Sequence, residues 1–324
     1  MSLDSTRQAE IQEEARAFDR RIEERSKAGF IPDLRRAVRC EYFYKSFWRD
    51  PEFIRIYLGP VIDAYLELID RHVGAGAKIL DVGCGAGYMA LELARAGHHV
   101  KAIDIASSCI ETAKRTLADN PYKQGFGSLA YEVASFEEVE GEYDVLLFSG
   151  CLHHLPDAEA AVRKALPLLR EGGTLLCWEP CHEEWRTDDA AQVALVRGML
   201  ATAGLWYERP DALGIDDPAG LWRLVGDIHE EYVEERDKSE AGGQSPHDNE
   251  SSGREILTAL RRYFVELDYR PMTSFIYRVL GGIRGPEDTV RDLARFLARY
   301  DRVGVDRGFL RPNNFIFMGR MLPR

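Results

Sequence analysis

The stretch AKILDVGCGAGY, residues 77–88, decides the fold of this chain. The apolar residues up to Val82 predict a short buried strand that ends at the first glycine. Glycines at alternate positions from Gly83 to Gly87 predict a tight turn, because they lack the Cβ atoms that would keep a ligand away from the backbone. A helix from about Met89 to Arg95 is expected next, with its free N–H groups near the turn. Strand, turn and helix together make half of a nucleotide-binding βαβ unit.

The second half of the unit follows directly. Residues His99–Ile105 predict another strand, and this strand carries Asp104. A carboxylate at that place can accept hydrogen bonds from both hydroxyls of a ribose. A dinucleotide is disfavoured, because Tyr88 stands where the third glycine of the dinucleotide fingerprint would be. Asp81 would repel a diphosphate but suits a cationic group, so the pattern favours a cationic cofactor that contains adenosine.

Four sequence blocks in register give the chain a resemblance to a known family. The blocks are Ile79–Gly87, Asp104, Tyr143–Ser149 and Leu168–Trp178. In order and spacing they resemble those of the class I, Rossmann-like methyltransferases that use S-adenosyl-L-methionine. The resemblance implies an α/β fold with a doubly wound, seven-stranded, mostly parallel sheet. It also implies S-adenosyl-L-methionine as the cofactor and methyl transfer as the reaction.

The resemblance extends over about residues 77–180 and implies roles for single residues. The glycine turn would pack on the methionine end of the cofactor, Asp81 would lie near the amino group, and Asp104 would bind the ribose. The acid that many relatives carry after the third strand is absent here, so adenine contacts are expected from Ser135 and Phe136. The predicted cofactor-binding residues are Tyr44, Asp81, Gly83, Cys84, Gly85, Gly87, Asp104, Ile105, Ser135, Phe136, Ser149 and Gly150.

The composition is that of a globular enzyme with a sizeable core, since 45% of the 324 residues are hydrophobic. A net charge of −12 makes a nucleic acid partner unexpected, because phosphate backbones require a basic face. The six cysteines show no CxxC pair and no disulfide-framework spacing, which indicates reduced thiols. No signal peptide and no apolar run near the ~20 residues of a membrane span is recognised. We therefore expect a cytoplasmic protein with a small-molecule acceptor substrate.

The N-terminal segment predicts a helical cover. Residues 5–27 carry Ile11, Ala15, Phe18 and Ile22 at helical spacing, the pattern of an amphipathic helix with a thin apolar stripe. Two settings are favoured for this stripe. It can pack on its own domain, or it can join two copies of the chain into a homo-oligomer. A membrane surface is disfavoured, because acids interrupt the polar face of the helix.

An aromatic segment follows at Cys40–Trp48. Core packing is expected for Phe43 and Phe47. Tyr44 is the candidate to close over the cofactor, because a tyrosine face near a sulfonium gives cation–π stabilisation and excludes water.

The fourth strand, Tyr143–Ser149, leads into Gly150-Cys151-Leu152-His153-His154. The ligand crevice of such a sheet lies at the carboxyl ends of its strands, so this loop should line the pocket. His153 and His154 are the candidate catalytic residues, because an imidazole can take a proton from an acceptor hydroxyl or amine. His153 is expected to lie nearer the substrate, because it comes earlier after the strand. Positioning alone can also suffice, since the sulfonium methyl is already activated.

Two local signals predict helix boundaries. Ser108 and Glu111 form the pattern of a capping box for the helix after Asp104. A second helix, capped by Asp157, is expected to end at Gly172-Gly173, and the fifth strand should follow at Thr174–Trp178.

The thiols, imidazole and carboxylates between Cys177 and Glu184 do not have the spacing of a zinc site, so no metal is expected. Two rival functions stay open: an aminopropyl transferase on the same cofactor, and a non-catalytic methyltransferase-like binding subunit. The expected parts of the chain are an N-terminal helical cover (1–72), a cofactor-binding core (73–182), a helical cap insertion (183–253) and a C-terminal completion of the sheet with a helical excursion (254–324).

Overall fold

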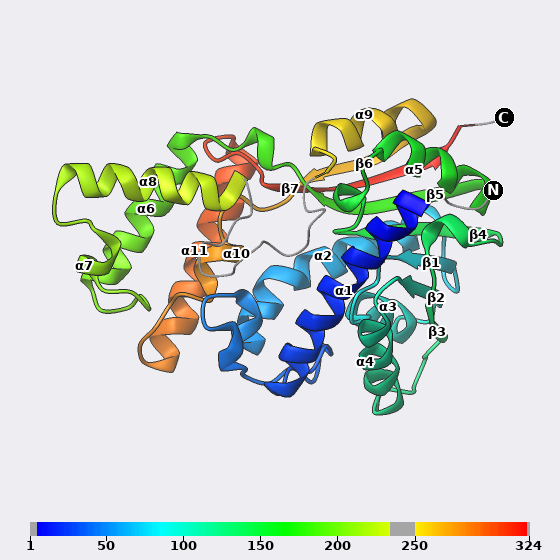
Figure 1. Cartoon of the computed structure of the whole chain (residues 1–324), viewed down its shortest axis with the longest axis horizontal. Helices are drawn as coiled ribbons and strands as arrows, with labels where there is room; N and C mark the ends of the chain where they lie inside the picture. The colour runs from blue at the N-terminus through cyan, green and yellow to red at the C-terminus, as the bar shows by residue number, and fades with distance from the viewer. Residues whose placement is uncertain (1–4, 234–249, 323–324) are drawn as a thin grey trace.

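The computed structural model describes residues 5–233 and 250–322, and its centre is a seven-stranded sheet (Figure 1). The strands lie in the order β3-β2-β1-β4-β5-β7-β6. Strands β1 to β5 run parallel, and β7 is antiparallel to both of its neighbours. The predicted doubly wound, mostly parallel sheet is confirmed. The strands are β1 (Lys78–Val82), β2 (His99–Asp104), β3 (Ser128–Val133), β4 (Tyr143–Ser149), β5 (Leu169–Pro180), β6 (Phe264–Pro271) and β7 (Asn314–Met321).

The strand order reverses at β1, which pairs with β2 on one side and with β4 on the other. Parallel sheets bind ligands beyond the carboxyl ends of their strands at such a switch point. Asp81, Asp104 and Ser149 stand at or beside the carboxyl ends of β1, β2 and β4. The topology therefore brings these three predicted residues to the same edge of the sheet.

Helices cover both faces of the sheet, because the central strands are apolar on both sides. Ile79 of β1 belongs to the core beneath α2 and α3, whereas the next residue, Leu80, belongs to the core beneath α5 and α9. In β4, Leu147 and Phe148 alternate in the same way. The covering helices include α2 (Pro51–His72), α3 (Tyr88–Arg95), α5 (Ala158–Ala165), α9 (Gly253–Tyr263) and α11 (Glu287–Arg307).

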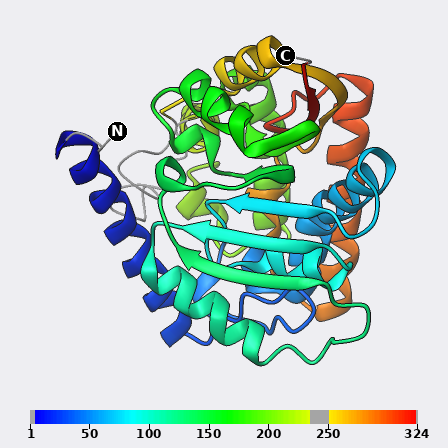
Figure 2. The ribbon, with the colours of Figure 1, turned by 90° about the vertical axis from the view of Figure 1, so that its right-hand side faces the viewer.

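Helix α1 (Ser5–Lys27) lies along α4 (Ser107–Ala118) of its own chain, as both ribbon views show (Figures 1 and 2). Phe18 and Ile22 of α1 pack with Ala106, at the start of α4. Of the two settings predicted for the apolar stripe, the structure shows packing on the helix's own domain.

The capping box predicted at Ser108 is wrong. Helix α4 begins after Ala106, whose side chain cannot cap it. The backbone N–H of Ser108 instead donates to Asp19 of α1 at 2.7 Å, and the Ser108 hydroxyl donates to Glu23 at 3.1 Å. The carboxylates of a distant helix thus stabilise the amino end of α4 and fix α1 in place.

Strand β5 begins earlier than predicted. Helix α5 ends at Ala165, and Leu169 already pairs with Tyr143 of β4. The pair Gly172-Gly173 therefore lies inside β5, next to a register shift between the two strands. Glycines in a strand commonly mark such irregularities. The prediction that these glycines end the helix was wrong, because Leu166, Leu168 and Leu169 fit the pattern of a helix as well as that of a strand.

The segment after β5 forms helices on the side of the molecule away from β3 (Figure 1, left). Trp185 stacks on Tyr232 of α8, with ring centroids 4.1 Å apart. Apolar residues of these helices share one core with α2, so the described part of the predicted cap is continuous with the core. Residues 234–249 of the predicted cap insertion lie outside the described residues. None of the described helices is long and apolar enough to cross a membrane. The remaining helices are α6 (Thr187–Thr202), α7 (Pro210–Leu213), α8 (Pro218–Val233) and α10 (Tyr277–Leu280).

Candidate functional site

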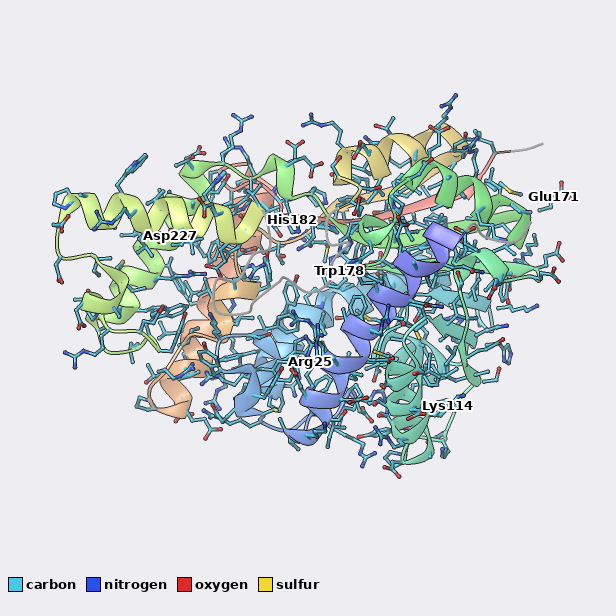
Figure 3. All side chains as sticks on the ribbon, in the orientation of Figure 1. Arg25, Lys114, Glu171, Trp178, His182 and Asp227 are labelled. Atoms are coloured by element: carbon cyan, nitrogen blue, oxygen red, sulfur yellow. The ribbon has the colours of Figure 1, made fainter. Side chains whose placement is uncertain are left out.

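A cavity of about 750 Å³ lies beyond the carboxyl ends of the central strands, within the range of small-molecule sites. Ends of β1, β2, β4 and β5 form one side of it, and α1, residues 42–48 and the cap helices form the rest. In the view of Figure 3, Arg25 of α1 and Trp178 of β5 lie near the centre, whereas Lys114 and Glu171 lie toward the edge.

The cavity contains nearly all of the predicted cofactor-binding residues, and the exception is Gly87. A Cβ atom on Gly87 would lie 2.5 Å from the Tyr131 hydroxyl oxygen, which donates to the Gly87 carbonyl at 2.6 Å. Gly87 thus leaves room for Tyr131 to pack on the turn, and its predicted contact with the cofactor stays a prediction. The predicted residues that line the cavity are Tyr44, Asp81, Gly83, Cys84, Gly85, Asp104, Ile105, Ser135, Phe136, Ser149 and Gly150.

Gly83 and Gly85 are required for different reasons, although both have positive φ values, +68° and +53°. A Cβ atom on Gly83 would lie 2.5 Å from Cys151 Sγ, so this glycine lets the loop after β4 approach β1. A Cβ atom on Gly85 would meet no protein atom within 4 Å. Because Gly85 lines the cavity, it leaves room for a ligand against the backbone.

Two carboxylates face the cavity beside this turn: Asp81 is buried and Asp104 is half-buried. Asp104 accepts hydrogen bonds from the backbone N–H of Gly85 at 2.7 Å and of Ala106 at 2.8 Å. Asp81 is 1% exposed, and neither of its carboxylate oxygens has a hydrogen-bond partner among the described residues. Burial, with a contribution from the charge of Asp104, raises the pKa of Asp81 to about 8. Burial also raises the pKa of Asp104, although its two backbone hydrogen bonds oppose this. A cationic ligand group would stabilise the ionised form of both acids.

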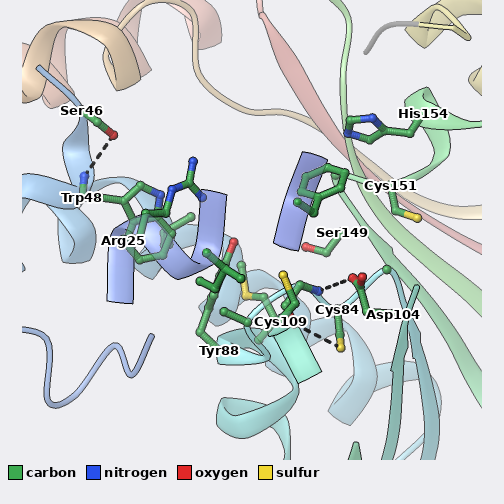
Figure 4. A pocket seen from close by; sticks show the side chains of 18 of the residues that line it. Arg25, Ser46, Trp48, Cys84, Tyr88, Asp104, Cys109, Ser149, Cys151 and His154 are labelled. Atoms are coloured by element: carbon green, nitrogen blue, oxygen red, sulfur yellow. Dashed lines mark hydrogen bonds between the residues drawn. The ribbon is translucent and has the colours of Figure 1, made fainter. Parts of the chain in front are cut away.

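The loop after β4 places its two histidines in different surroundings, and their predicted order is reversed. His153 is 6% exposed, has its Nδ1 2.7 Å from Glu179 and does not line the cavity. His154 does line it (Figure 4). Its Nδ1 lies 3.1 Å from Glu14, and its ring lies edge-on to Phe18. The prediction that His153 lies nearer the substrate is therefore corrected. A 3₁₀ turn at this point directs the first histidine into the core.

Sequence comparison then identifies the domain that holds this site. Residues 79–173 match the family model described as a methyltransferase domain. The chain contains a class I methyltransferase domain. The matched segment includes the glycine turn, Asp104 and both histidines, and the strand order of the sheet agrees with it.

Relatives of this methyltransferase domain include two ubiquinone biosynthesis O-methyltransferases. The protein from Aromatoleum aromaticum is 35% identical over 113 residues, which cover 33% of this chain and 46% of the relative. The protein from Chromobacterium violaceum is 35% identical over 132 residues, which cover 40% of this chain and 55% of the relative. The chain thus spans about half the length of the curated relatives it matches.

Solved structures that resemble most of the chain do so at low sequence identity. A SAM-dependent methyltransferase from Methanosarcina mazei is 16% identical with a TM-score of 0.45, covering 79% of this chain and 98% of its own. Geranyl diphosphate C-methyltransferase from Streptomyces coelicolor is 12% identical with a TM-score of 0.45, covering 82% and 81%. At these scores the likenesses add nothing to what the strand order of the sheet already shows.

Glu179 holds the loop after β4 in place, a role that was not predicted from the sequence. One of its carboxylate oxygens accepts hydrogen bonds from the backbone N–H of Cys151 and of Leu152, each at 2.9 Å. The other oxygen contacts the His153 ring. Glu179 belongs to β5 and the loop follows β4, so only the strand pairing brings them together.

Aromatic residues lie around the glycine turn. Tyr88 and Trp48 lie beside the turn with ring centroids 5.1 Å apart (Figure 4). Burial, with a contribution from the charge of Asp81, raises the pKa of Tyr88 to about 12. Tyr44, predicted to cover the cofactor, is 44% exposed and has its ring edge-on to Tyr207 of the cap.

Ser135 and Phe136 line the cavity at the end of β3, but both side chains also have structural contacts. Ser135 accepts a hydrogen bond from the backbone N–H of Glu137 at 3.3 Å. Phe136 packs edge-on against Phe148 of β4. Their predicted contacts with adenine therefore depend on the face of Phe136 and on the backbone.

Cys177 of β5 and Cys181 directly after this strand belong to the core. Cys177 and Cys181 are buried in the hydrophobic cluster beneath α5 and α9. Across residues 5–233 and 250–322, no group of three or more His, Cys, Asp or Glu side chains is placed to hold a metal ion.

Proposed function

We propose that this chain transfers a methyl group from S-adenosyl-L-methionine to an oxygen, nitrogen or carbon nucleophile of a small-molecule acceptor. One observation carries the proposal. Asp81 is a buried carboxylate without a hydrogen-bond partner among the described residues, and it faces the cavity next to the open position at Gly85. A buried acid in this state requires a cationic partner to stay ionised. The names of the curated relatives support methyl transfer and favour an oxygen nucleophile.

The residues around the cavity fit this cofactor. When bound, it supplies a methyl group that the neighbouring sulfonium activates. Asp81 would bind its amino group, and Asp104 would bind the ribose hydroxyls with lone pairs that its backbone hydrogen bonds leave available. Gly85 gives the methionine end access to the backbone. Arg25 also lines the cavity and its charge acts on Tyr88, so it supplies a positive charge for the cofactor's carboxylate.

His154 is the group that would take a proton from the acceptor, because it is the histidine that lines the cavity. The acceptor would lie against the aromatic wall formed by Tyr57, Trp178 and Tyr277. The ring of Tyr57 lies 5.8 Å from each of the other two. Such a wall positions an organic molecule and excludes water from the transfer.

Methyl-labelled S-adenosyl-L-methionine tests the proposed reaction. The protein is incubated with the labelled cofactor and a metabolite extract, and the products are separated by size. We expect the label in a small organic molecule, which mass spectrometry then identifies. Label that stays in the cofactor, or that enters only protein or nucleic acid, would contradict the proposal.

Cofactor affinity should depend on pH through Asp81. Its pKa of about 8 means that most of the carboxyl is protonated at neutral pH, while an ammonium partner requires the carboxylate. Affinity should therefore fall about tenfold for each pH unit well below 8. It should also fall above pH 8, as the amino group of the cofactor loses its proton. Calorimetric titrations from pH 6 to pH 9 should show an affinity maximum near pH 8. In Asp81→Asn the fall in affinity below pH 8 should be absent. A wild-type affinity that is constant between pH 6 and pH 8, together with an unchanged affinity in Asp81→Asn, would exclude Asp81 as the cation site.

Asp104→Ala should weaken binding of S-adenosyl-L-methionine by roughly 1.5–3 kcal/mol, the scale of hydrogen bonds to a charged group. The substitution also removes the acceptor that holds the Gly85 N–H, so thermal unfolding must show that the fold is retained. Asp119→Ala, at an exposed position after α4, is the matched control. Equal affinities of the two variants, measured by calorimetry, would remove Asp104 from the cofactor site.

A further inference from the structure

Helix α1 contributes more than a hydrophobic cover to the site. Its residues Glu14, Phe18, Ile22 and Arg25 recur at helical spacing on one face, and all four line the cavity. Helix α1 is held in place by Asp19 and Glu23, whose carboxylates accept hydrogen bonds from the first residues of α4. Glu14 lies one helical turn before Phe18 and is 7% exposed.

Glu14 of α1 and His154 of the loop after β4 lie next to each other in the wall of the cavity. Oε1 of Glu14 lies 3.1 Å from Nδ1 of His154, and Phe18 meets the same ring edge-on with centroids 5.6 Å apart. A buried carboxylate beside one imidazole nitrogen favours the proton on that nitrogen. The other nitrogen, Nε2, is then the one that can accept a proton.

We propose that Glu14 is a positioning residue for His154: it holds the Nδ1–H tautomer and so makes Nε2 the proton acceptor of the methyl transfer. The inference rests on the proposed function, because it takes His154 as the base. It adds that the base is complete only when α1 is docked on α4. The N-terminal helix is then part of the reacting site, not only its cover.

Other charged groups surround the imidazole and belong to the same account. Asp104 at the end of β2 interacts electrostatically with His154. On its own turn His154 contacts His153, with ring centroids 4.2 Å apart, and Glu179 of β5 lies behind that ring. Of these acids, Glu14 is the one within ion-pair distance of His154 Nδ1.

The tautomer of His154 gives a readout that does not depend on the unknown acceptor. Protein labelled with ¹⁵N-histidine is studied by NMR at a pH where the ring is neutral, with S-adenosylhomocysteine added. We compare the wild type with Glu14→Ala, and Glu13→Ala serves as the control because its side chain is exposed on the same turn of α1. The wild type and Glu13→Ala should show Nδ1–H, whereas Glu14→Ala should shift toward Nε2–H. A wild-type ring with Nε2–H, or a ring that Glu14→Ala leaves unchanged, would overturn the proposal.

Rates of methyl transfer distinguish a failure of this inference from a failure of the proposed function. With any acceptor that the wild type methylates, Glu14→Ala should lower the rate roughly ten- to a hundredfold at unchanged cofactor affinity. Glu14→Gln should restore part of the rate, because its amide oxygen can take the same place beside Nδ1 as an acceptor for Nδ1–H. If His154→Ala is slow but Glu14→Ala is as fast as the wild type, only the role of Glu14 is wrong. If His154→Ala itself has full activity, the base in the proposed function is wrong.

Discussion

His154→Ala is expected to lower the rate of methyl transfer by roughly a hundredfold to ten-thousandfold, the usual contribution of a general base. The imidazole lines the cavity and is the proton acceptor in the proposed reaction. Its removal should leave the affinity for S-adenosyl-L-methionine unchanged, because Asp81, Asp104 and the glycine turn bind the cofactor. The measurement is transfer of labelled methyl under single-turnover conditions. The remaining activity should rise with pH, as deprotonated acceptor replaces the lost base.

His153→Ala is the matched comparison, and its expected defect is of another kind. His153 is buried, and its ring is hydrogen-bonded to Glu179. Glu179 also accepts hydrogen bonds from the backbone of the loop after β4. Its loss should lower the melting temperature and loosen that loop, whereas His154→Ala should leave the melting temperature close to that of the wild type. If His153→Ala lost the rate at full stability and His154→Ala kept it, the two roles assigned by the structure would be exchanged.

Gly85→Val should abolish measurable binding of S-adenosyl-L-methionine. The backbone at Gly85 has φ +53°, and an added side chain would extend into the cavity where the methionine end is proposed to lie. A left-handed conformation costs a non-glycine residue roughly 1–2 kcal/mol, so some loss of stability is expected as well. Steric exclusion from the cavity should dominate the effect on binding. Calorimetry measures the affinity, and thermal unfolding measures the stability.

Gly125→Val separates the two effects. Gly125 has φ +69° and, like Gly85, no protein atom within 4 Å of an added Cβ, but it lies in an exposed loop outside the cavity. It should therefore show a similar loss of stability with normal cofactor affinity. Equal cofactor affinities in the two variants would show that the glycine turn does not contact the cofactor.

Much of the fold could be predicted because its signals are local. The glycine turn, the apolar run of β4 and the stripe of α1 each carry their pattern within a few residues. Their places in the structure follow from the period of the side chains and from the rule that ligands bind at the carboxyl ends of parallel strands. For the same reason Asp81 and Asp104 could be assigned to one edge of the sheet.

The parts that could not be predicted depend on contacts between distant segments. Asp19 caps a helix that begins nearly ninety residues later, and Glu179 holds the loop of a neighbouring strand. Of the two adjacent histidines, His153 contacts Glu179 and His154 contacts Glu14, and the order of the residues in the sequence does not show these contacts. Gly87 fits the glycine pattern, yet its packing against Tyr131 appears only when β3 is in place.

The central claim is that the cavity beside Asp81 and Gly85 binds a cationic adenosine cofactor. Calorimetric titration of the full chain with S-adenosyl-L-methionine tests it most directly, with NAD as the comparison ligand. We predict one bound S-adenosyl-L-methionine per chain, much weaker binding to Asp81→Asn, and no binding of NAD. A folded wild-type protein that binds NAD, or that does not bind S-adenosyl-L-methionine, would contradict the account.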